Sequence, residues 1–228
     1  MRARFVALAD AAPAPAVVVI DVLRAFTVVP WLYDVGAARV LTVAARDHAF
    51  HLRDATLPDA VLAGEEDGRP IPGFDLGNSP SELADRDLTG RTVVHRTSAG
   101  TQGLARTVGS PVVLAASFVT AGATARALRD AEVEEATFVI TGASLGRDGD
   151  EDLAAAELIA ARAAGDDPEP TPYLERIARS DAGRLFAPEG PDWAPPADLA
   201  MAAELDRFDR AFTAVPIPDL DAVEVRPR

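Results

Sequence analysis

The sequence predicts a three-layer α/β/α fold with a largely parallel or mixed central sheet. Two observations predict it: short, nearly continuous apolar runs rich in Val and Ile recur along the 228 residues, and amphipathic helical patterns lie between them. Strands that are apolar on both faces are typical of a sheet that helices cover on either side. We therefore expect strands and helices to alternate along the chain.

The chain is expected to begin with a strand and a loop over residues 1–16, because the apolar run before Asp10 is too short for a secretory signal. Runs of β-branched and apolar residues predict seven further strands, at 16–22, 39–43, 60–63, 92–95, 111–116, 137–141 and 222–226. Apolar residues at helical spacing predict helices between them, at 24–35, 45–55, 100–108, 119–130, 152–164, 173–180 and 197–212. Pro and Asp cluster at 165–172 and 187–198, which predicts loops there.

The length fits a single domain over 1–228 that buries a sizeable core. Charge is uneven along it: residues 1–131 contain 13 Arg and 14 Asp or Glu, whereas residues 132–228 contain 9 Arg and 22 Asp or Glu. We interpret the acidic last third, from about residue 165 to 228, as an extension of the same domain. An anion site is expected in the nearly neutral first part.

The composition excludes several classes of protein. Without cysteine there is no disulfide, thiolate zinc site or cysteine nucleophile, and a cytoplasmic location is expected. Without lysine there is no Schiff-base or P-loop lysine. A net charge of -14 opposes binding to nucleic acid or an anionic membrane, and no apolar run is long enough to cross a membrane. A small molecule is the expected partner, with the oligomeric state left open, a homo-oligomer included.

Five polar clusters stand out at the predicted strand-to-helix junctions, the part of an open α/β sheet where ligands bind. After the first buried strand, Asp21 can ligate a hard cation or act as a nucleophile, and the Arg24 guanidinium suits a phosphate; a helix cap beside a surface Arg is the alternative. Residues 64–68 place three acids between glycines, which fits Mg²⁺ or an exposed acidic turn.

The cluster at 73–82 has two features. Ser79 and Glu82 have capping-box spacing, with Pro80 expected at the first helical position. Capping leaves Asp75 and Asn78 unexplained, and a glycine-bearing loop before a helix is a natural anion cradle.

The last two clusters offer an oxyanion pocket and further acids. Residues 96–101 combine Arg96 with hydroxyls and a glycine at a helix start, although ordinary N-capping by Thr97 or Ser98 explains the hydroxyls alone. Residues 148–152 hold four acids, more than one helix cap requires, which makes metal ligation a fair hypothesis.

Taken in order, these clusters resemble the 2-phosphosulfolactate phosphatases. The resemblance is carried by 21–25 with Thr27, by 64–65, by the Gly-Phe-Asp-Leu-Gly-Asn-Ser-Pro string at 73–80, and by 97–101, 117–118, 151–152 and 215–216. It implies a Mg²⁺-dependent acid phosphatase connected with coenzyme M biosynthesis, which hydrolyses the phosphate monoester of a small, multiply anionic hydroxy acid.

The resemblance also implies roles for particular residues. The catalytic candidates are Asp21, Arg24 and Asp75, and Asp21 is the nucleophile if a phosphoenzyme forms; direct attack by water is the other route. The candidate metal ligands are Asp21, Glu65, Asp75, Glu151 and Asp152, some of them through water. The candidate phosphate-binding residues are Arg24, Asn78, Ser79, Arg96, Thr97, Ser98, Gly100 and Thr101.

Two other functions compete with this one. A noncatalytic protein would keep the anion pocket without turnover. A dinucleotide-dependent oxidoreductase would use Gly142 and Gly146, but their spacing is not the full Gly-x-Gly-x-x-Gly fingerprint. We predict that His48, His51 and His95 do not ligate metal, and that catalysis by carboxylates gives an acidic pH optimum.

Overall fold

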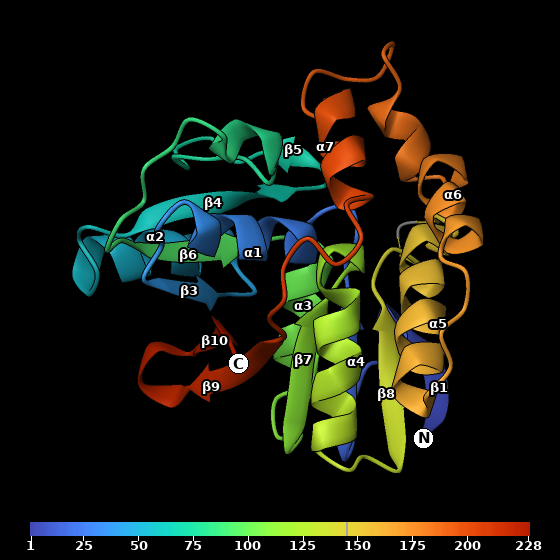
Figure 1. Ribbon diagram of the computed structural model, residues 1–228. Coiled ribbons are helices and arrows are strands. Elements are labelled where there is room, and N and C mark those ends of the chain that lie inside the picture. Colours follow the sequence, from blue (N-terminus) through green and yellow to red (C-terminus); the bar gives the residue numbers. More distant parts are fainter. Residues whose placement is uncertain (145) are drawn as a thin grey trace.

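The computed structural model describes residues 1–144 and 146–228. Its strands form one mixed, mostly parallel sheet in the order β1-β8-β2-β7-β9-β10-β3-β6-β4-β5 (Figure 1). The strands are β1 Arg2–Ala7, β2 Ala16–Ile20, β3 Arg39–Thr42, β4 Val61–Glu66, β5 Arg69–Pro70, β6 Thr92–Arg96, β7 Val112–Ala116, β8 Glu135–Ile140, β9 Phe212–Ile217 and β10 Ala222–Pro227. The α-helices are α1 Ala25–Asp34, α2 Arg46–Ala55, α3 Gly100–Arg106, α4 Ala121–Asp130, α5 Asp150–Ala164, α6 Thr171–Arg179 and α7 Pro196–Ala202. The predicted three-layer α/β fold is confirmed.

The sheet consists of two parallel groups joined by a hairpin. Strands β1, β8, β2 and β7 pair in parallel, as do β3, β6 and β4. The antiparallel hairpin β9 and β10 lies between them, with β9 paired to β7 and β10 paired to β3. The two groups run in different directions in Figure 1.

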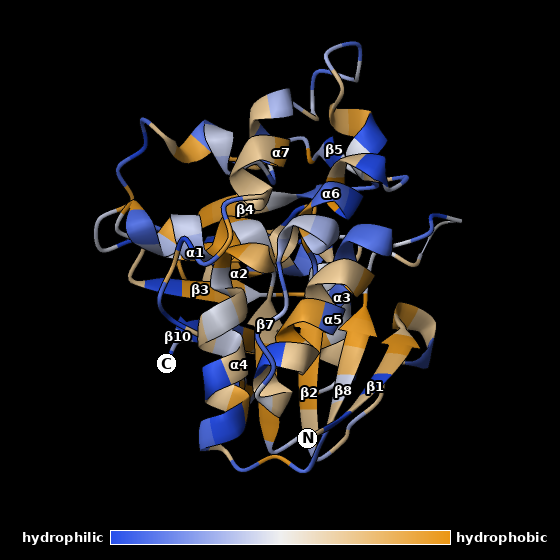
Figure 2. Cartoon of the chain, turned by 45° about the vertical axis from the view of Figure 1, so that its right-hand side comes forward, coloured by the Kyte–Doolittle hydropathy of each residue, from blue (hydrophilic) through white to orange (hydrophobic). Residues whose placement is uncertain are grey.

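Strand β2 shows why the core forms on both faces of the sheet. All five of its residues are buried, with Val18 and Ile20 in one apolar cluster and Val17 and Val19 in another. Successive side chains of a strand point to opposite faces, so a continuous apolar run suits a strand with helices on both sides. Figure 2 shows β2 and β8 in hydrophobic colours and α4 with a hydrophilic side.

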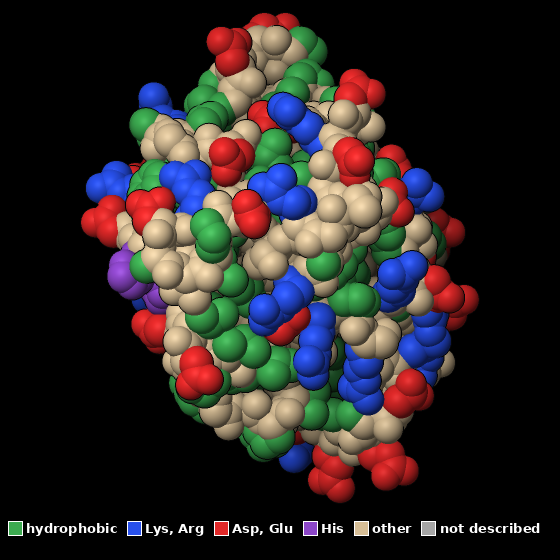
Figure 3. Space-filling view, turned by 90° about the vertical axis from the view of Figure 1, so that its left-hand side faces the viewer, with side chains coloured by type: hydrophobic (Ala, Val, Ile, Leu, Met, Phe, Trp, Pro, Cys, Tyr) green, Lys and Arg blue, Asp and Glu red, His purple; other side chains and the backbone are tan. Residues whose placement is uncertain are grey.

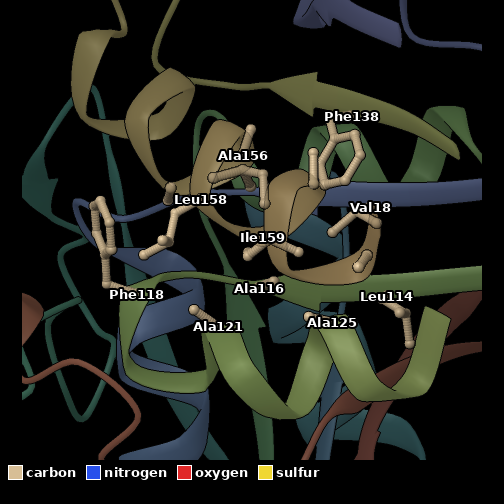
Figure 4. Packing of buried hydrophobic residues seen from close by; sticks show 14 of the residues in the cluster. Val18, Leu114, Ala116, Phe118, Ala121, Ala125, Phe138, Ala156, Leu158 and Ile159 are labelled. Carbon is tan, nitrogen blue, oxygen red and sulfur yellow. The ribbon is translucent and has the colours of Figure 1, made fainter. Parts of the chain in front are cut away.

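The cluster under α4 and α5 depends on small residues. Ala121 and Ala125 of α4 and Ala156 of α5 face the strands, with Phe118 and Leu158 filling the space beside them (Figure 4). Alanine faces let helices lie close to a sheet while larger residues complete the packing. The other face is covered by α1 and α3, and α2 packs on β4 and β6.

A proline inside α1 explains one buried hydroxyl. Pro30 has no N–H, so the carbonyl of Phe26 one turn earlier loses its helical partner. The Ser117 hydroxyl, fully buried, donates to this carbonyl at 3.1 Å. Ser117 thus stabilises the helix that follows Asp21.

Three expectations about local structure were wrong. The helix predicted over 197–212 ends at Ala202, and strand β9 begins at Phe212. Residues 203–211 form turns and loop, and Phe212 pairs with β7 and β10 instead of ending a helix. Strand β5 was also missed, since its two residues carry no pattern.

The capping box at Ser79 was wrong as well. Only a 3₁₀ turn, Ser81–Leu83, follows Pro80, and the Ser79 hydroxyl donates to Asp198 instead of to a helical N–H. Glu82 accepts from the N–H of Gly77.

The surface mixes both signs of charge. Figure 3 shows Arg side chains interspersed with Asp and Glu on the face that it presents. Among the helices of the described residues, none is long and apolar enough to span a membrane.

Candidate functional site

A small cavity lies where strands of both parallel groups end. Asp21 follows β2, Thr141 and Gly142 follow β8, Ser98 follows β6, and Glu65 lies near the end of β4. The cavity has a free volume of about 50 Å³, room for a few water-sized groups. The lining residues are Asp21, Leu23, Arg24, Glu65, Gly68, Asn78, Ser98, Ala99, Thr141, Gly142, Ser144, Arg147, Glu151, Asp152, Ala182, Leu185, Phe186 and Trp193.

Asp21 is a buried carboxylate directly after strand β2. Its Oδ1 accepts the N–H of Ala25 at 2.9 Å, so the start of α1 holds it in place. Gly100 lies against it, since a Cβ there would come within 2.6 Å of Asp21 Oδ2. Burial, aided by repulsion from Glu65 and Glu151, raises the pKa of Asp21 to about 7, against the lowering effect of the nearby N–H groups.

Asp152 links the tips of β2 and β8. Its Oδ1 accepts the N–H of Val22 and its Oδ2 that of Gly142, both at 2.7 Å, and the Thr141 hydroxyl donates to Oδ2 at 3.2 Å. Burial and repulsion from Glu151 and Asp21 raise its pKa well above the ordinary value. Both oxygens of Asp152 are therefore engaged by the protein.

Glu151 is the least engaged of the buried acids. It is 1% exposed, and its Oε2 has no hydrogen-bond partner among the described residues. Burial raises its pKa above the ordinary value. A buried carboxylate oxygen without a partner is costly, so this atom fits a ligand, a cation or a proton.

The predicted oxyanion pocket after β6 holds the carboxylate of Glu65. The N–H of Ser98 donates to Glu65 Oε1 at 2.6 Å, and the N–H of Gly68 donates to Oε2 at 2.5 Å. The Ser98 hydroxyl adds a bond to Oε2 at 3.3 Å. These donors fix the carboxylate at the cavity wall.

Arg24 joins the front of the chain to the acidic last third. Its Nη1 donates to Asp198 Oδ2 at 2.6 Å and to the Trp193 carbonyl at 2.9 Å, and its guanidinium lies 5.1 Å from the Phe186 ring centroid. Asp198 is fully buried, and its Oδ1 also accepts from Ser79 and Ser81. Arg24 keeps its remaining N–H groups for the cavity that it lines.

Residues 182–198, which follow α6 and include the first residues of α7, form the roof of the cavity (Figure 1). Leu185, Phe186 and Trp193 lie over the polar groups. A Cβ on Gly68 would come within 2.9 Å of the Trp193 ring, so the ring can pack here only because residue 68 has no side chain. The roof supplies the apolar side of an otherwise charged site.

A buried histidine orients Asn78. His95 is fully buried, its Nε2 lies 3.0 Å from Asn78 Oδ1, and its Nδ1 has no partner among the described residues. Burial lowers its pKa to about 4, so the ring is neutral. An unpaired acceptor at Nδ1 costs less than an unpaired N–H, so we assign the proton to Nε2, which donates to Asn78. The amide N–H groups of Asn78 are thereby left to the cavity.

Several residues predicted for the site lie outside the cavity lining. Asp75 is half exposed, lies 3.6 Å from Arg53 and accepts the N–H of Leu62. Arg96 donates to the Glu65 carbonyl and pairs with Glu66 at 3.4 Å. Thr97 and Thr101 bond to each other at the start of α3.

Two more residues act from behind the lining. Gly100 makes room for Asp21, and Ser79 binds Asp198. The structure therefore brings together Asp21, Arg24, Glu65, Asn78, Ser98, Glu151 and Asp152, but not Asp75 or Arg96.

Sequence reasoning missed four residues that matter here. Arg147 lies in the loop after β8, inside a cluster chosen for its acids, so its charge was the available signal. Asp198 and Trp193 lie in the acidic last third, far from any strand end, and nothing local marks them. His95 was weighed only as a metal ligand.

The carboxylates fit a hard cation, although they surround the cavity without converging on one point. Within the described residues, no group of three or more Asp, Glu or His side chains stands in a metal-binding arrangement. The unpartnered Glu151 Oε2 and the repulsion among Asp21, Glu65 and Glu151 nevertheless suit a cation such as Mg²⁺, which takes oxygen ligands and keeps several waters. Asp152 and Glu65 are less available as ligands than Glu151, because both oxygens of each accept backbone N–H groups.

The fold and the cavity define an α/β protein with a carboxylate-lined cavity at the ends of its parallel strands. Residues 6–184 match the 2-phosphosulpholactate phosphatase family, and the chain belongs to this family.

Three relatives named probable 2-phosphosulfolactate phosphatase are similar to it. The one from Bacillus subtilis is 36% identical over 148 residues, 65% of this chain and 64% of that protein. The one from Deinococcus radiodurans is 43% identical over 162 residues, 70% and 66% of the two chains. The one from Synechococcus sp. strain JA-2-3B'a(2-13) is 33% identical over 217 residues, 84% and 85%. The chain thus spans slightly under two thirds of the Bacillus and Deinococcus relatives.

Proposed function

We propose that this protein is a Mg²⁺-dependent phosphatase that hydrolyses the phosphate monoester of a small anionic hydroxy acid, 2-phosphosulfolactate by family likeness, to sulfolactate and phosphate. One observation carries the proposal: Asp21, Glu65 and Glu151 line the same cavity as the buried guanidinium of Arg24. Carboxylates and a guanidinium together are the groups that phosphoryl transfer needs.

The residues divide the work as follows. Asp21, Glu65 and Glu151 would hold Mg²⁺, which when bound neutralises charge on the phosphoryl oxygens. Arg24 and the Asn78 amide donate to phosphoryl oxygens. In one route Asp21 attacks phosphorus, the P–O ester bond breaks, the leaving oxygen takes a proton from water, and a second water hydrolyses the phosphoaspartate. In the other route Asp21 takes the proton of an attacking water and returns it to the leaving oxygen. A pKa of about 7 suits the second role near neutral pH.

Phosphate release tests this proposal. The purified protein, stripped with EDTA, is given 2-phosphosulfolactate, 2-phospholactate and simple alkyl phosphates with and without Mg²⁺. We expect release that depends on Mg²⁺ and favours the anionic esters. Tight binding of these esters without release under any metal condition would instead establish a noncatalytic anion-binding protein.

A further inference from the structure

One arginine of the cavity wall, Arg147, has no role in the proposed chemistry. Arg147 and Arg24 are the arginines among the cavity-lining residues of the described chain, which has no lysine. They differ in how far their charge is compensated.

Arg24 is neutralised by the protein. It is 5% exposed and forms an ion pair of 2.6 Å with Asp198, which is fully buried. An ion pair at this distance, shielded from water, leaves Arg24 as a hydrogen-bond donor with little net charge for a ligand.

Arg147 has no such partner. Among residues 1–144 and 146–228, no side chain or carbonyl forms a hydrogen bond or ion pair with its guanidinium. The acid next to it is engaged elsewhere: Asp148 accepts the N–H groups of Asp150 and Asp181. The influence of Arg147 reaches the site, because its charge lowers the pKa of Glu151 against the effect of burial.

The backbone of this loop supports an inward position for Arg147. It lies between Gly146 and Gly149, both in the left-handed region with φ of 78° and 63°. A Cβ on Gly149 would come within 2.3 Å of the Ala143 N, so this tight turn needs glycine. Arg147 thus presents, at a half-buried position of the cavity wall, a guanidinium without a hydrogen-bond or ion-pair partner among the described residues.

We infer that Arg147 is a specificity-determining residue, which binds a second anionic group of the substrate, a carboxylate or a sulfonate, beside the phosphate. This inference rests on the proposed function, since it assigns the non-phosphate part of the same substrate. A planar guanidinium binds either oxyanion through paired N–H groups. A phosphate ester without a second anion leaves the charge of Arg147 unused.

Three esters that differ only in this respect test the inference. Propane-1,2-diol 2-phosphate has no second anion, 2-phospholactate adds a carboxylate, and 2-phosphosulfolactate adds a sulfonate to that. For Arg147→Gln we expect kcat/KM to fall about 10- to 100-fold on an ester that carries the recognised anion, and less than about 3-fold on the diol phosphate. A loss first seen with 2-phospholactate identifies the carboxylate, and a loss confined to 2-phosphosulfolactate identifies the sulfonate.

Two variants serve as controls. Arg2→Gln removes the same charge from an exposed position that pairs with Glu135, outside the cavity lining, and should leave all three values unchanged. Arg147→Lys keeps the charge and should recover part of the loss. An equal loss on all three esters, or no loss on any, overturns the inference.

Failure of the proposed function is recognised separately. If the wild-type protein hydrolyses none of the esters, calorimetric titration of the same three esters replaces kinetics. Weaker binding of only the anionic esters by Arg147→Gln then supports the role of Arg147 without catalysis, and equal affinity in wild type and variant refutes it.

Discussion

Asp21, Glu151 and Asp152 are three acids within one buried site, and their contacts separate their roles. Asp152 is bound by backbone N–H groups at both oxygens, whereas Glu151 Oε2 has no partner in the described chain. Asp21 is intermediate in this respect, because one of its oxygens accepts the N–H of Ala25. In our proposal, the carboxylate of Asp152 connects two strands, that of Glu151 is an open ligand and that of Asp21 is the reactive group.

Asp21→Asn should abolish turnover on either catalytic route, because an amide neither attacks phosphorus nor accepts a proton. We expect kcat to fall at least about 1000-fold in phosphate-release assays. The fold should persist, since asparagine keeps an oxygen for the Ala25 N–H. Near-normal kcat in a folded variant would refute the assignment of Asp21.

His95 should act on the substrate only through Asn78. His95→Phe removes the donor to Asn78 Oδ1, and we expect KM to rise about 10-fold with a smaller change in kcat. His95→Gln, which restores an N–H donor, should recover part of the loss. The matched comparison is Asn78→Ala: adding His95→Phe to it should change KM little further. Independent, additive effects of the two changes would contradict this coupling.

At the scale of elements, the 3₁₀ turn Ser81–Leu83 and α7 meet at one buried carboxylate. Asp198 of α7 binds Arg24, the Ser79 hydroxyl and the Ser81 N–H, so two segments distant from it in sequence depend on it. Breaking a buried ion pair from one side leaves the other charge without a partner. The roof and the start of α1 are therefore linked energetically.

Asp198→Asn should weaken both stability and activity. We expect the free energy of unfolding to fall by about 3 kcal/mol, measured by urea denaturation, because Arg24 stays buried without its counterion. Activity should fall as well, since Arg24 loses its fixed position. Glu175→Gln breaks an exposed ion pair with Arg179 and should change stability by less than about 0.5 kcal/mol. Equal, small effects of both variants would show that the Asp198 pair is not structural.

At the scale of the whole molecule, burying acids makes folding depend on pH. The pKa of Asp21 is about 7 in the folded protein and near 3.8 without the fold. The folded state therefore favours the protonated carboxyl. The protonated Asp21 carboxyl contributes fully to stability at pH values below its pKa in the unfolded chain, and this contribution is lost as the pH rises through about 7.

Metal-free protein should accordingly lose stability between pH 5 and pH 8. We expect wild type to lose roughly 2–3 kcal/mol more than Asp21→Asn over this range, measured by urea denaturation in EDTA. Mg²⁺ should reduce the difference at pH 8, because a bound cation favours the ionised form. Parallel pH profiles for wild type and variant would contradict burial as the source of the raised pKa.

Much of the sheet could be predicted because its strands are apolar on both faces. The five consecutive apolar residues of β2 are too apolar for an exposed segment, and the amphipathic patterns around them fit helices. Strand β9 could not be predicted, because Pro216 interrupts the run Phe212–Ile217, which becomes a strand by pairing with β7 and β10. That hairpin joins the two parallel groups, which makes the last third of the chain part of the central sheet as well as an extension.

The sequence by itself determined the α/β class and the set of strand-end acids, since hydrophobic periodicity and charge are properties of local segments. Only the tertiary structure decided which polar groups meet. It placed Arg96 and Asp75 outside the cavity and brought in Arg147, Asp198 and Trp193. The physical reason is that hydrogen-bond donors predicted to bind a substrate anion are instead paired with buried carboxylates of the protein. The loop after β6 takes Glu65, and Arg24 takes Asp198, partners that chain folding alone brings within hydrogen-bonding distance.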